Sequence, residues 1–317
     1  MIAIVNYHPL LVVCSLLLVS CASNPSNCLT GIKLNNTISQ TQLLDDLKTL
    51  ASDEMAGRKT RSAGSLKAQS YITQRFVQSH LESFGSDYLQ PFIYGINRNK
   101  RGTNIVGIKR GTSHADEFIV VTAHYDHIGR SGSRIYNGAD DNASGVSAML
   151  AIADTLSQRE TRHSIIFLAT DAEEDGLFGA KAFVANPPVK LAQIKYNLNL
   201  DMVSQGGSGR RLYVAGTKKN PQLIPLVNEV IKNASVCLKP GHEGPQKMRG
   251  ATISQPDWRF ASDHAPFAKH KIPYLYFGVD LHRHYHEYTD TFDNIDPEFF
   301  TAATETILAT FFALDKQ

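Results

Sequence analysis

Histidine and carboxylate side chains recur in this chain directly after short apolar runs. The first two such segments are AHYDH (residues 123–127) and GADDNASG (residues 138–145), in which a small-residue turn opens a helix. Three more follow along the chain: AEE with its preceding Asp (171–174), NLDM (199–202) and YHEYTDT (285–291). Imidazole and carboxylate ligands mixed in one site are typical of a catalytic zinc that keeps one coordination position open. Because five separate candidates exceed what one tetrahedral ion needs, the pattern predicts a two-metal hydrolytic centre.

Hydrophobic periodicity predicts the elements that must position these side chains. Two helices open the folded part and two short β-like runs follow them; the segments are 43–50, 66–76, 89–94 and 104–109. Apolar strands then alternate with helices. The strands are expected at 118–122, 165–170, 197–202, 212–215 and 274–277, and the helices at 145–156, 177–184 and 223–233. A closing helix follows Asp296, a good N-cap, and Pro297, which suits a first helical position.

This alternation predicts an α/β fold with a mostly parallel, mixed central sheet and helices on both faces. Ligands of such sheets collect beyond the carboxyl ends of the strands. His124, Glu173, Glu174 and Asp201 all fall at or just after the end of an expected strand. Fold and candidate site therefore agree without reference to any other protein.

The five motifs, taken in this order and spacing, resemble the zinc aminopeptidases of metallopeptidase family 28. The resemblance runs from about residue 43 to the C-terminus. It implies a zinc-peptidase, aminopeptidase-like fold and two Zn²⁺ per chain. It also implies hydrolysis of N-terminal residues from peptides with a free N-terminus.

The resemblance also assigns roles to individual residues. Asp141 matches the ligand that bridges the two ions; His124 and Asp201 match the remaining ligands of one ion, and Glu174 and His286 those of the other. Glu173, beside Glu174, matches the general base, which takes a proton from the attacking water and passes it to the departing amine.

Other residues near these motifs are expected to have supporting roles. Asp126 resembles an aspartate that orients His124, and Asp290 is expected either to do the same near His286 or to cap a turn or helix. His282 and His284 compete with His286 only if the register of the motif is shifted, and His127 is interpreted as a supporting or structural residue. No catalytic role is assigned to residues 262–264 (SDH), which match a family segment near the mouth of the site.

The N-terminus predicts export. Residues 9–20 form an apolar run shorter than the roughly 20 residues of a membrane span, which is typical of a signal peptide. The run ends in LVSC (18–21), which resembles the bacterial lipoprotein cleavage box with Cys21 as the lipidated residue. No Lys or Arg precedes the run, so a simple secretory signal or an uncleaved anchor stays open.

The expected organisation is a signal peptide (1–20), a lipidated tether (21–38) and a single catalytic domain (39–317). Ala22 lacks the aspartate that favours inner-membrane retention, so the expected location is the periplasmic side of the outer membrane, with lipid as the only membrane contact. Cys28 and Cys237 would remain in an oxidising compartment, where they could pair.

The composition says little about the class of protein, except that it gives no support for a nucleic-acid-binding protein. The 317 residues carry a formal net charge of only +2, which gives no reason to expect nucleic acid as a partner. A loop at 241–260, which holds the only tryptophan, Trp258, could wall a substrate pocket or lie on the surface. Three alternatives to an aminopeptidase remain: a single-zinc glutaminyl cyclase, a carboxypeptidase of the same family, and a binding domain without activity.

Overall fold

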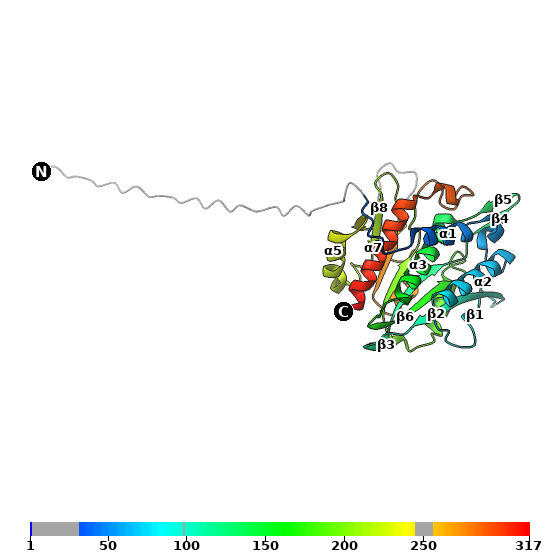
Figure 1. The fold of residues 1–317 in the computed structure, drawn as a ribbon, viewed down its shortest axis with the longest axis horizontal. Helices are drawn as coiled ribbons and strands as arrows, with labels where there is room; N and C mark the ends of the chain where they lie inside the picture. Colours follow the sequence, from blue (N-terminus) through cyan, green and yellow to red (C-terminus); the bar gives the residue numbers. More distant parts are fainter. Residues whose placement is uncertain (2–31, 98, 245–255) are drawn as a thin grey trace.

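The computed structural model describes residue 1 and residues 32–97, 99–244 and 256–317. Its centre is an eight-stranded mixed sheet with the strand order β1-β2-β6-β3-β7-β10-β8-β9 (Figure 1). The strands are β1 (Leu89–Tyr94), β2 (Lys100–Lys109), β3 (His114–His124), β6 (His163–Thr170), β7 (Ile194–Leu200), β8 (Arg211–Ala215), β9 (Cys237–Pro240) and β10 (Tyr274–Gly278). A separate hairpin pairs β4 (Gly129–Ser131) with β5 (Arg134–Tyr136).

The four central strands, β6, β3, β7 and β10, run parallel to one another. Antiparallel pairings lie toward both edges, where β2 joins β6, β1 joins β2, and β8 joins β10. The predicted mostly parallel, mixed sheet is therefore confirmed. Its parallel centre brings the carboxyl ends of β3, β6 and β7 to one edge, where the candidate motifs lie.

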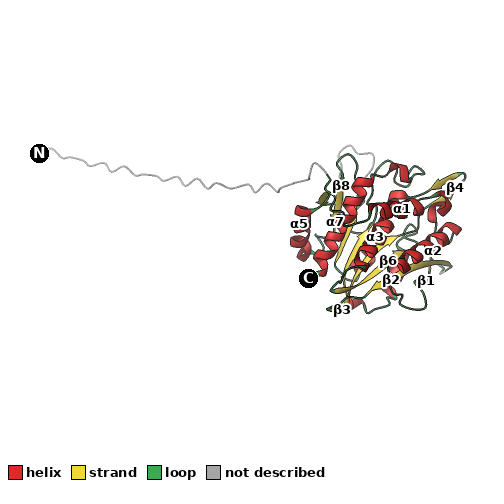
Figure 2. Cartoon of the chain, viewed as in Figure 1, coloured by secondary structure: helices red, strands yellow, loops and turns green. Residues whose placement is uncertain are grey.

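Helices cover both faces of the sheet (Figure 2). One face carries α1 (Gln40–Leu50), α2 (Ala63–Gln78), α3 (Gly145–Ser157), α5 (Ile224–Asn233) and α7 (Pro297–Asp315). The other face carries α4 (Phe178–Ala185) and α6 (His264–Lys269). As predicted, α7 begins at Pro297, and the side chain of Asp296 accepts a hydrogen bond from the backbone N–H of Phe299.

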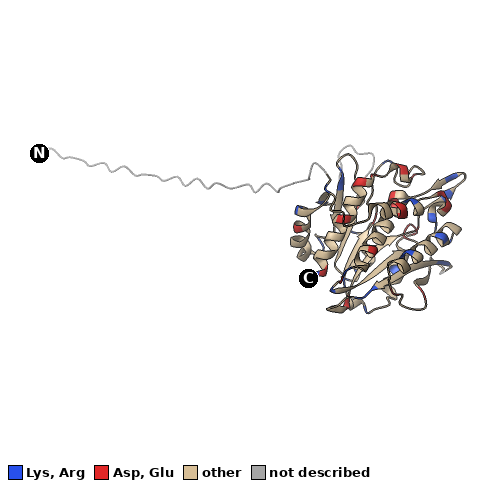
Figure 3. Cartoon of the chain, viewed as in Figure 1, with Lys and Arg blue, Asp and Glu red and all other residues tan. Residues whose placement is uncertain are grey.

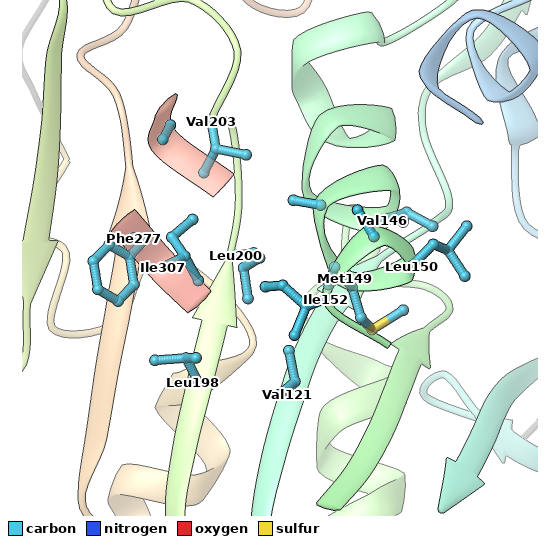
Figure 4. Close-up of a cluster of buried hydrophobic side chains, with 14 of the residues drawn as sticks. Val121, Val146, Met149, Leu150, Ile152, Leu198, Leu200, Val203, Phe277 and Ile307 are labelled. Carbon is cyan, nitrogen blue, oxygen red and sulfur yellow. The ribbon is translucent and has the colours of Figure 1, made fainter. Parts of the chain in front are cut away.

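Apolar side chains form a core on each face of the sheet. The central strands contribute to both, because successive side chains of a strand point to opposite faces. Val121 of β3 belongs to the larger core and its neighbour Val120 to the smaller one. Figure 4 shows Val121, Leu198 and Leu200 from the sheet beside Met149 and Ile152 of α3. The site is thus built on strands whose positions are fixed by apolar packing on both sides.

Four short elements escaped the sequence-based prediction. The strand β9, the β4–β5 hairpin and the short helix α6 have between three and six residues each. Such lengths are too short for hydrophobic periodicity to register. The strand expected at 197–202 also ends earlier, at Leu200, so that Asp201 lies just beyond it.

The N-terminal predictions lie mostly outside the described residues. The signal peptide, Cys21 and Cys28 all belong to residues 2–31, while Cys237 is disulfide-bonded to a partner outside the described part. Pairing with Cys28 stays a prediction. Within the expected tether, Ile38 is buried and the backbone N–H groups of Asn35 and Thr37 donate to Glu305. Among the helices of the described ranges, none is both long and apolar enough to span a bilayer.

Candidate functional site

The five predicted ligands come together at the carboxyl edge of the sheet. His124 is the last residue of β3, and Asp201 immediately follows β7. The Nε2 atom of His124 lies 3.4 Å from Oδ1 of Asp141 and 3.3 Å from Oδ1 of Asp201. All three side chains are buried and offer ligand atoms within 4.8 Å of one another. They form the first group of candidate ligands.

A second group meets at the other oxygen of Asp141. Nε2 of His286 lies 3.1 Å from Oδ2 of Asp141 and 3.3 Å from Oε2 of Glu174. Asp141 thus directs one oxygen to each group, which is the arrangement a bridging carboxylate requires. The structure brings together all five residues that the sequence predicted as ligands.

His127 also lies in this second group, although the sequence suggested no ligand role for it. Its side chain is buried, and its Nδ1 is 2.7 Å from Oε1 of Glu174 and 3.9 Å from Oδ2 of Asp141. Among the described residues, its Nε2 has no hydrogen-bond partner. His127 therefore either supports Glu174 through a hydrogen bond or offers an imidazole to the same ion as His286.

The centre holds more negative charge than the surrounding protein neutralises. Among the described residues, no Lys or Arg pairs with the carboxylates of Asp141, Glu173, Glu174 or Asp201. Burial would lower the pKa of His286, but hydrogen bonds to Asp141 and Glu174 raise that pKa to about 10. Burial likewise opposes protonation of His124, yet nearby carboxylates, Glu173 first, raise its pKa well above the ordinary value.

A divalent cation would supply the positive charge that these carboxylates lack. Buried carboxylates are costly unless they are paired or coordinate a metal. The mixed imidazole and carboxylate donors suit zinc, and the open cavity in front of them leaves room for water. The residues present therefore fit the metal that the sequence pattern predicted.

Glu173 faces the same cavity but belongs to neither ligand group. Burial raises the pKa of its carboxyl group well above the ordinary value, and the nearby carboxylates of Asp263 and Asp201 add to the increase. The neighbouring Glu174 behaves in the opposite way, because hydrogen bonds from His127 and His286 overcome burial and lower its pKa. Two adjacent glutamates thus have different environments, which is how one site keeps a ligand and a proton carrier apart.

Asp126 supports the site in two ways. Its backbone carbonyl lies 3.2 Å from Nδ1 of His124, closer than its own carboxylate oxygen at 3.9 Å. The carboxylate instead accepts hydrogen bonds from the backbone N–H groups of Glu173 at 3.0 Å and Glu174 at 3.4 Å. Asp126 therefore orients His124 through its main chain and both glutamates through its side chain.

Asp290 holds the turn that carries the bridging residue. Its carboxylate accepts hydrogen bonds from the backbone N–H groups of Asp140 and Asp141, at 3.0 to 3.1 Å. Asp140 turns away from the ligand groups, because its own carboxylate binds Ser204 and His282. Of the two open roles for Asp290, the structure therefore supports turn stabilisation.

Asn142 ties the same turn to the end of β7, a role that the sequence gave no reason to expect. Its side-chain oxygen accepts hydrogen bonds from the backbone N–H groups of Gly145 and Met202, and its NH₂ group donates to the carbonyl of Leu200. A Cβ atom at Gly145 would lie 2.3 Å from that side-chain oxygen. The small residues of GADDNASG therefore permit close approach between the turn and the strand.

Two other predicted segments lie beside the centre. His282 contacts Asp140 and His284 contacts Thr289, so neither joins a ligand group. Ser262, Asp263 and His264 are fully buried behind the cavity. Burial raises the pKa of Asp263 to about 6 and lowers that of His264 to about 4.

Aromatic side chains wall the cavity in front of the ligands. The cavity measures about 60 Å³, and besides the ligands and Glu173 its lining is mainly apolar: Met202, Pro256, Trp258, Ala261, Tyr276, Val279, Leu281 and Tyr285. The indole of Trp258 packs against the ring of Tyr276 with their centroids 4.5 Å apart. The described part of the 241–260 loop thus contributes to the wall of the site, and residues 245–255 lie outside the described ranges.

Arg58 is a second supporting residue that the sequence did not reveal. Its guanidinium is fully buried and donates to four backbone carbonyls, those of Leu50, Tyr125, Asn137 and Gly138. Burial lowers its pKa to about 10, against the opposing effect of Asp141 and other carboxylates. Because Tyr125 follows His124 and Gly138 begins the GADDNASG turn, Arg58 clamps two ligand-bearing loops together.

Arg58→Met should therefore destabilise the protein by roughly 3 kcal/mol, since the buried carbonyls lose their donors. Urea unfolding at fixed zinc concentration measures this loss. The matched control is Arg110→Met, which removes an exposed pair with Glu82 and should cost no more than about 1 kcal/mol. Equal costs for the two variants would show that Arg58 does not act as a clamp.

The sequence of this chain is similar to those of known peptidases and related proteins. Residues 104–311 match the family model of Peptidase family M28. Aminopeptidase YwaD of Bacillus subtilis (strain 168) is 28% identical over 228 residues, which are 69% of this chain and 46% of that protein. The alkaline phosphatase isozyme conversion protein of Escherichia coli (strain K12) is 26% identical over 184 residues, which are 53% of this chain and 52% of that protein. The chain thus spans about half the length of these relatives.

Solved structures share the fold. A zinc aminopeptidase from Bacillus subtilis has a TM-score of 0.68 at 18% identity, with 87% of this chain and 95% of that chain covered. The glutaminyl cyclase of Porphyromonas gingivalis has the same TM-score at 19% identity, with 89% and 100% covered. The family match spans all the motif residues from His124 to His286, and the chain belongs to peptidase family M28.

Proposed function

We propose that the chain is a di-zinc aminopeptidase that removes N-terminal residues from peptides. The observation that carries this proposal is the position of Asp141, which directs one carboxylate oxygen to each of two ligand groups. Zinc aminopeptidases among the similar proteins support the same reading. Two ions held in this way are the arrangement of many hydrolytic centres.

Under this proposal His124 and Asp201 would hold one zinc and Glu174 and His286 the other, and Asp141 would be shared between them. Zinc held there would supply Lewis-acid chemistry, which polarises a carbonyl group and lowers the pKa of bound water. Glu173 accepts the proton of the attacking water and transfers it to the departing amine. Burial raises the pKa of its carboxyl group above the ordinary value, and a carboxylate accepts a proton more readily as its pKa rises.

The small aromatic cavity supports an exopeptidase rather than an endopeptidase. Among the described residues, the cavity beside the ligands measures only about 60 Å³, which favours entry of one side chain over passage of a continuing peptide chain. We infer that the N-terminal residue enters this cavity. Met202, Trp258 and Tyr276 then favour an apolar side chain at that position.

A glutaminyl cyclase is the second candidate, because a solved cyclase has the same fold. The two groups of ligands favour the peptidase, since a cyclase of this type needs one zinc. A carboxypeptidase of the same family would need its substrate in the opposite direction.

One panel of assays separates these candidates. Purified protein is incubated with aminoacyl chromogenic amides, with N-acetylated peptides that have a free C-terminus, and with glutaminyl peptides, each with and without a chelator. We expect chelator-sensitive release from the aminoacyl amides alone. Cyclisation of the glutaminyl peptide without amide hydrolysis would refute the proposal.

We further propose that the protein is a bacterial lipoprotein, organised as a signal peptide (1–20), a tether attached through Cys21, and one catalytic domain. The motif LVSC at residues 18–21 supports this proposal. The native protein should incorporate radioactive fatty acid and partition with outer membranes, while Cys21→Ser should not be labelled. A soluble, unlabelled wild-type protein would contradict the lipid anchor and leave a secretory signal.

A further inference from the structure

A second and larger cavity adjoins the candidate metal centre. It measures about 530 Å³ and shares only Glu174 and His286 with the aromatic cavity. The rest of its wall comes from the 59–61 segment, from the β1–β2 region, from the loop after β3 and from Asp175 in the loop after β6. Because Glu174 and His286 line both cavities, the two cavities meet at the second group of candidate ligands.

Two of the three cations that line the larger cavity form no ion pair with any described residue, although Lys59 is close enough to Asp175 to help lower the pKa of that carboxyl group. Lys59, Arg61 and Lys100 all line it. Lys100 is neutralised, since its Nζ lies 3.0 Å from a carboxylate oxygen of Asp175, which also accepts from Tyr94. Within the described part of the chain, Lys59 and Arg61 form no ion pair, and both are exposed.

The acidic residues of this cavity are all engaged elsewhere. Asp126 accepts hydrogen bonds from the backbone N–H groups of Glu173 and Glu174. Glu174 is held by His127 and His286, and Asp175 pairs with Lys100 and Tyr94, while Lys59 interacts with Asp175 only at longer range. The charge that remains available to a ligand is therefore positive.

The segment that carries the two cations is anchored to the catalytic loops. Thr60, between Lys59 and Arg61, donates its hydroxyl to Asp171 at 2.8 Å and lies 3.4 Å from a carboxylate oxygen of Asp126. On the other side of Lys59, Arg58 is fixed by its four backbone carbonyls. Lys and Arg (blue in Figure 3) also occur on the nearby β4–β5 hairpin and on α2. Lys59 and Arg61 thus extend from a backbone held in place relative to Glu173 and Glu174.

We propose that Lys59 and Arg61 bind a carboxylate on the leaving-group side of the substrate, so that the enzyme prefers peptides with negative charge just after the scissile bond. This inference rests on the proposed aminopeptidase function, in which the N-terminal residue occupies the aromatic cavity. The leaving group then enters the larger cavity. The carboxylate is either the free C-terminus of a short peptide or an acidic side chain.

Four substrates distinguish these two sources. Leu-Asp-amide and Leu-Asn-amide differ in the charge of one side chain, while Leu-Ala and Leu-Ala-amide differ in a terminal carboxylate. For wild-type protein we expect kcat/KM about fivefold to tenfold higher for the charged member of at least one pair, the range of two exposed ion pairs. The preference should shrink in 0.5 M NaCl, because exposed charges are screened.

The variant Lys59→Gln/Arg61→Gln should remove this preference while it hydrolyses leucyl 4-nitroanilide, which lacks a carboxylate, within about twofold of wild type. The matched control is Arg110→Gln/Lys232→Gln, which removes the same charge from exposed positions outside this cavity. This control should keep the preference. A preference for the aspartyl pair alone identifies the side chain as the source, and one for the Leu-Ala pair alone identifies the terminus.

A binding measurement separates this inference from the proposed function. Calorimetry with Glu173→Gln protein compares Kd for Leu-Asp-amide and Leu-Asn-amide, and for Leu-Ala and Leu-Ala-amide, with and without the Lys59→Gln/Arg61→Gln changes. A ratio of about fivefold that disappears with the two changes supports the carboxylate site even if wild-type protein hydrolyses no peptide. Equal affinities within both pairs, or ratios that the two changes leave unaltered, overturn it.

Discussion

Glu173→Gln should lower kcat by at least about 10³-fold while KM and zinc content stay nearly unchanged. The amide keeps the size and shape of the carboxylate but removes the oxygen that accepts a proton. Glu173 lies outside both ligand groups and pairs with no Lys or Arg among the described residues, so its loss should not disturb the metals. The interaction that is lost exists in the transition state, which is why kcat rather than KM should change. Steady-state kinetics on leucyl 4-nitroanilide and elemental analysis of the same protein test this expectation.

Glu174→Gln is the matched comparison, because it makes the same change one residue away. Glu174 lies 3.3 Å from Nε2 of His286 and 2.7 Å from Nδ1 of His127, so its replacement should weaken metal binding. Activity should then recover in part with excess zinc. If Glu173→Gln loses metal while Glu174→Gln loses only turnover, the two roles are reversed. Full activity in both variants would refute the assignment of a base to this pair.

The architecture was predictable because long apolar strands and helices carry strong periodic signals. The runs at 118–122 and 165–170 became the centres of β3 and β6, and the closing helix started at Pro297 as its capping residues indicated. The order of strands in the sheet was not predictable. It depends on long-range pairing, such as that of β8 between β10 and β9, which no local pattern encodes.

The convergence of the five ligands was predictable for a related reason. Parallel strands end at the same edge, so His124 and Asp201, each at the end of its own strand, had to approach one another. No such rule predicts the residues that hold the ligand-bearing loops in place. Arg58 reaches Tyr125 and Gly138 across 67 and 80 residues. In the sequence it stands in the polar stretch RKTR (58–61), where nothing local distinguishes a buried arginine from solvated ones.

His127 shows the same limit within a motif. The sequence places it three residues after His124, and nothing local decides whether its ring faces the site. In the structure the ring packs over Gly138, where a Cβ would lie 2.5 Å from it, and its Nδ1 points at Glu174. A glycine 11 residues away along the chain therefore allows this histidine to enter the centre.

Asp141→Ala should remove both zinc ions, because Asp141 is the only described residue that contributes to both ligand groups. Wild-type protein should contain about two zinc ions per chain. Asp201→Ala, which removes a ligand of one group only, should leave about one, since Glu174 and His286 still meet at Oδ2 of Asp141. Asp175→Ala provides the control, because its carboxylate binds Lys100 and Tyr94 instead of a ligand group and should leave zinc content unchanged.

Inductively coupled plasma mass spectrometry after dialysis gives these metal contents, and circular dichroism shows whether each variant is folded. The decisive comparison is the zinc content of the two variants. Asp141→Ala should lose more zinc than Asp201→Ala, although both changes delete one carboxylate. A single tight zinc in the wild type, lost equally in the two variants, would contradict a shared bridge and favour the glutaminyl cyclase alternative. Two zincs in the wild type with equal partial loss in both variants would instead mean that Asp141 binds one ion, and that the second is held by Glu174 with His286 and His127, whose Nδ1 already lies within reach of Glu174.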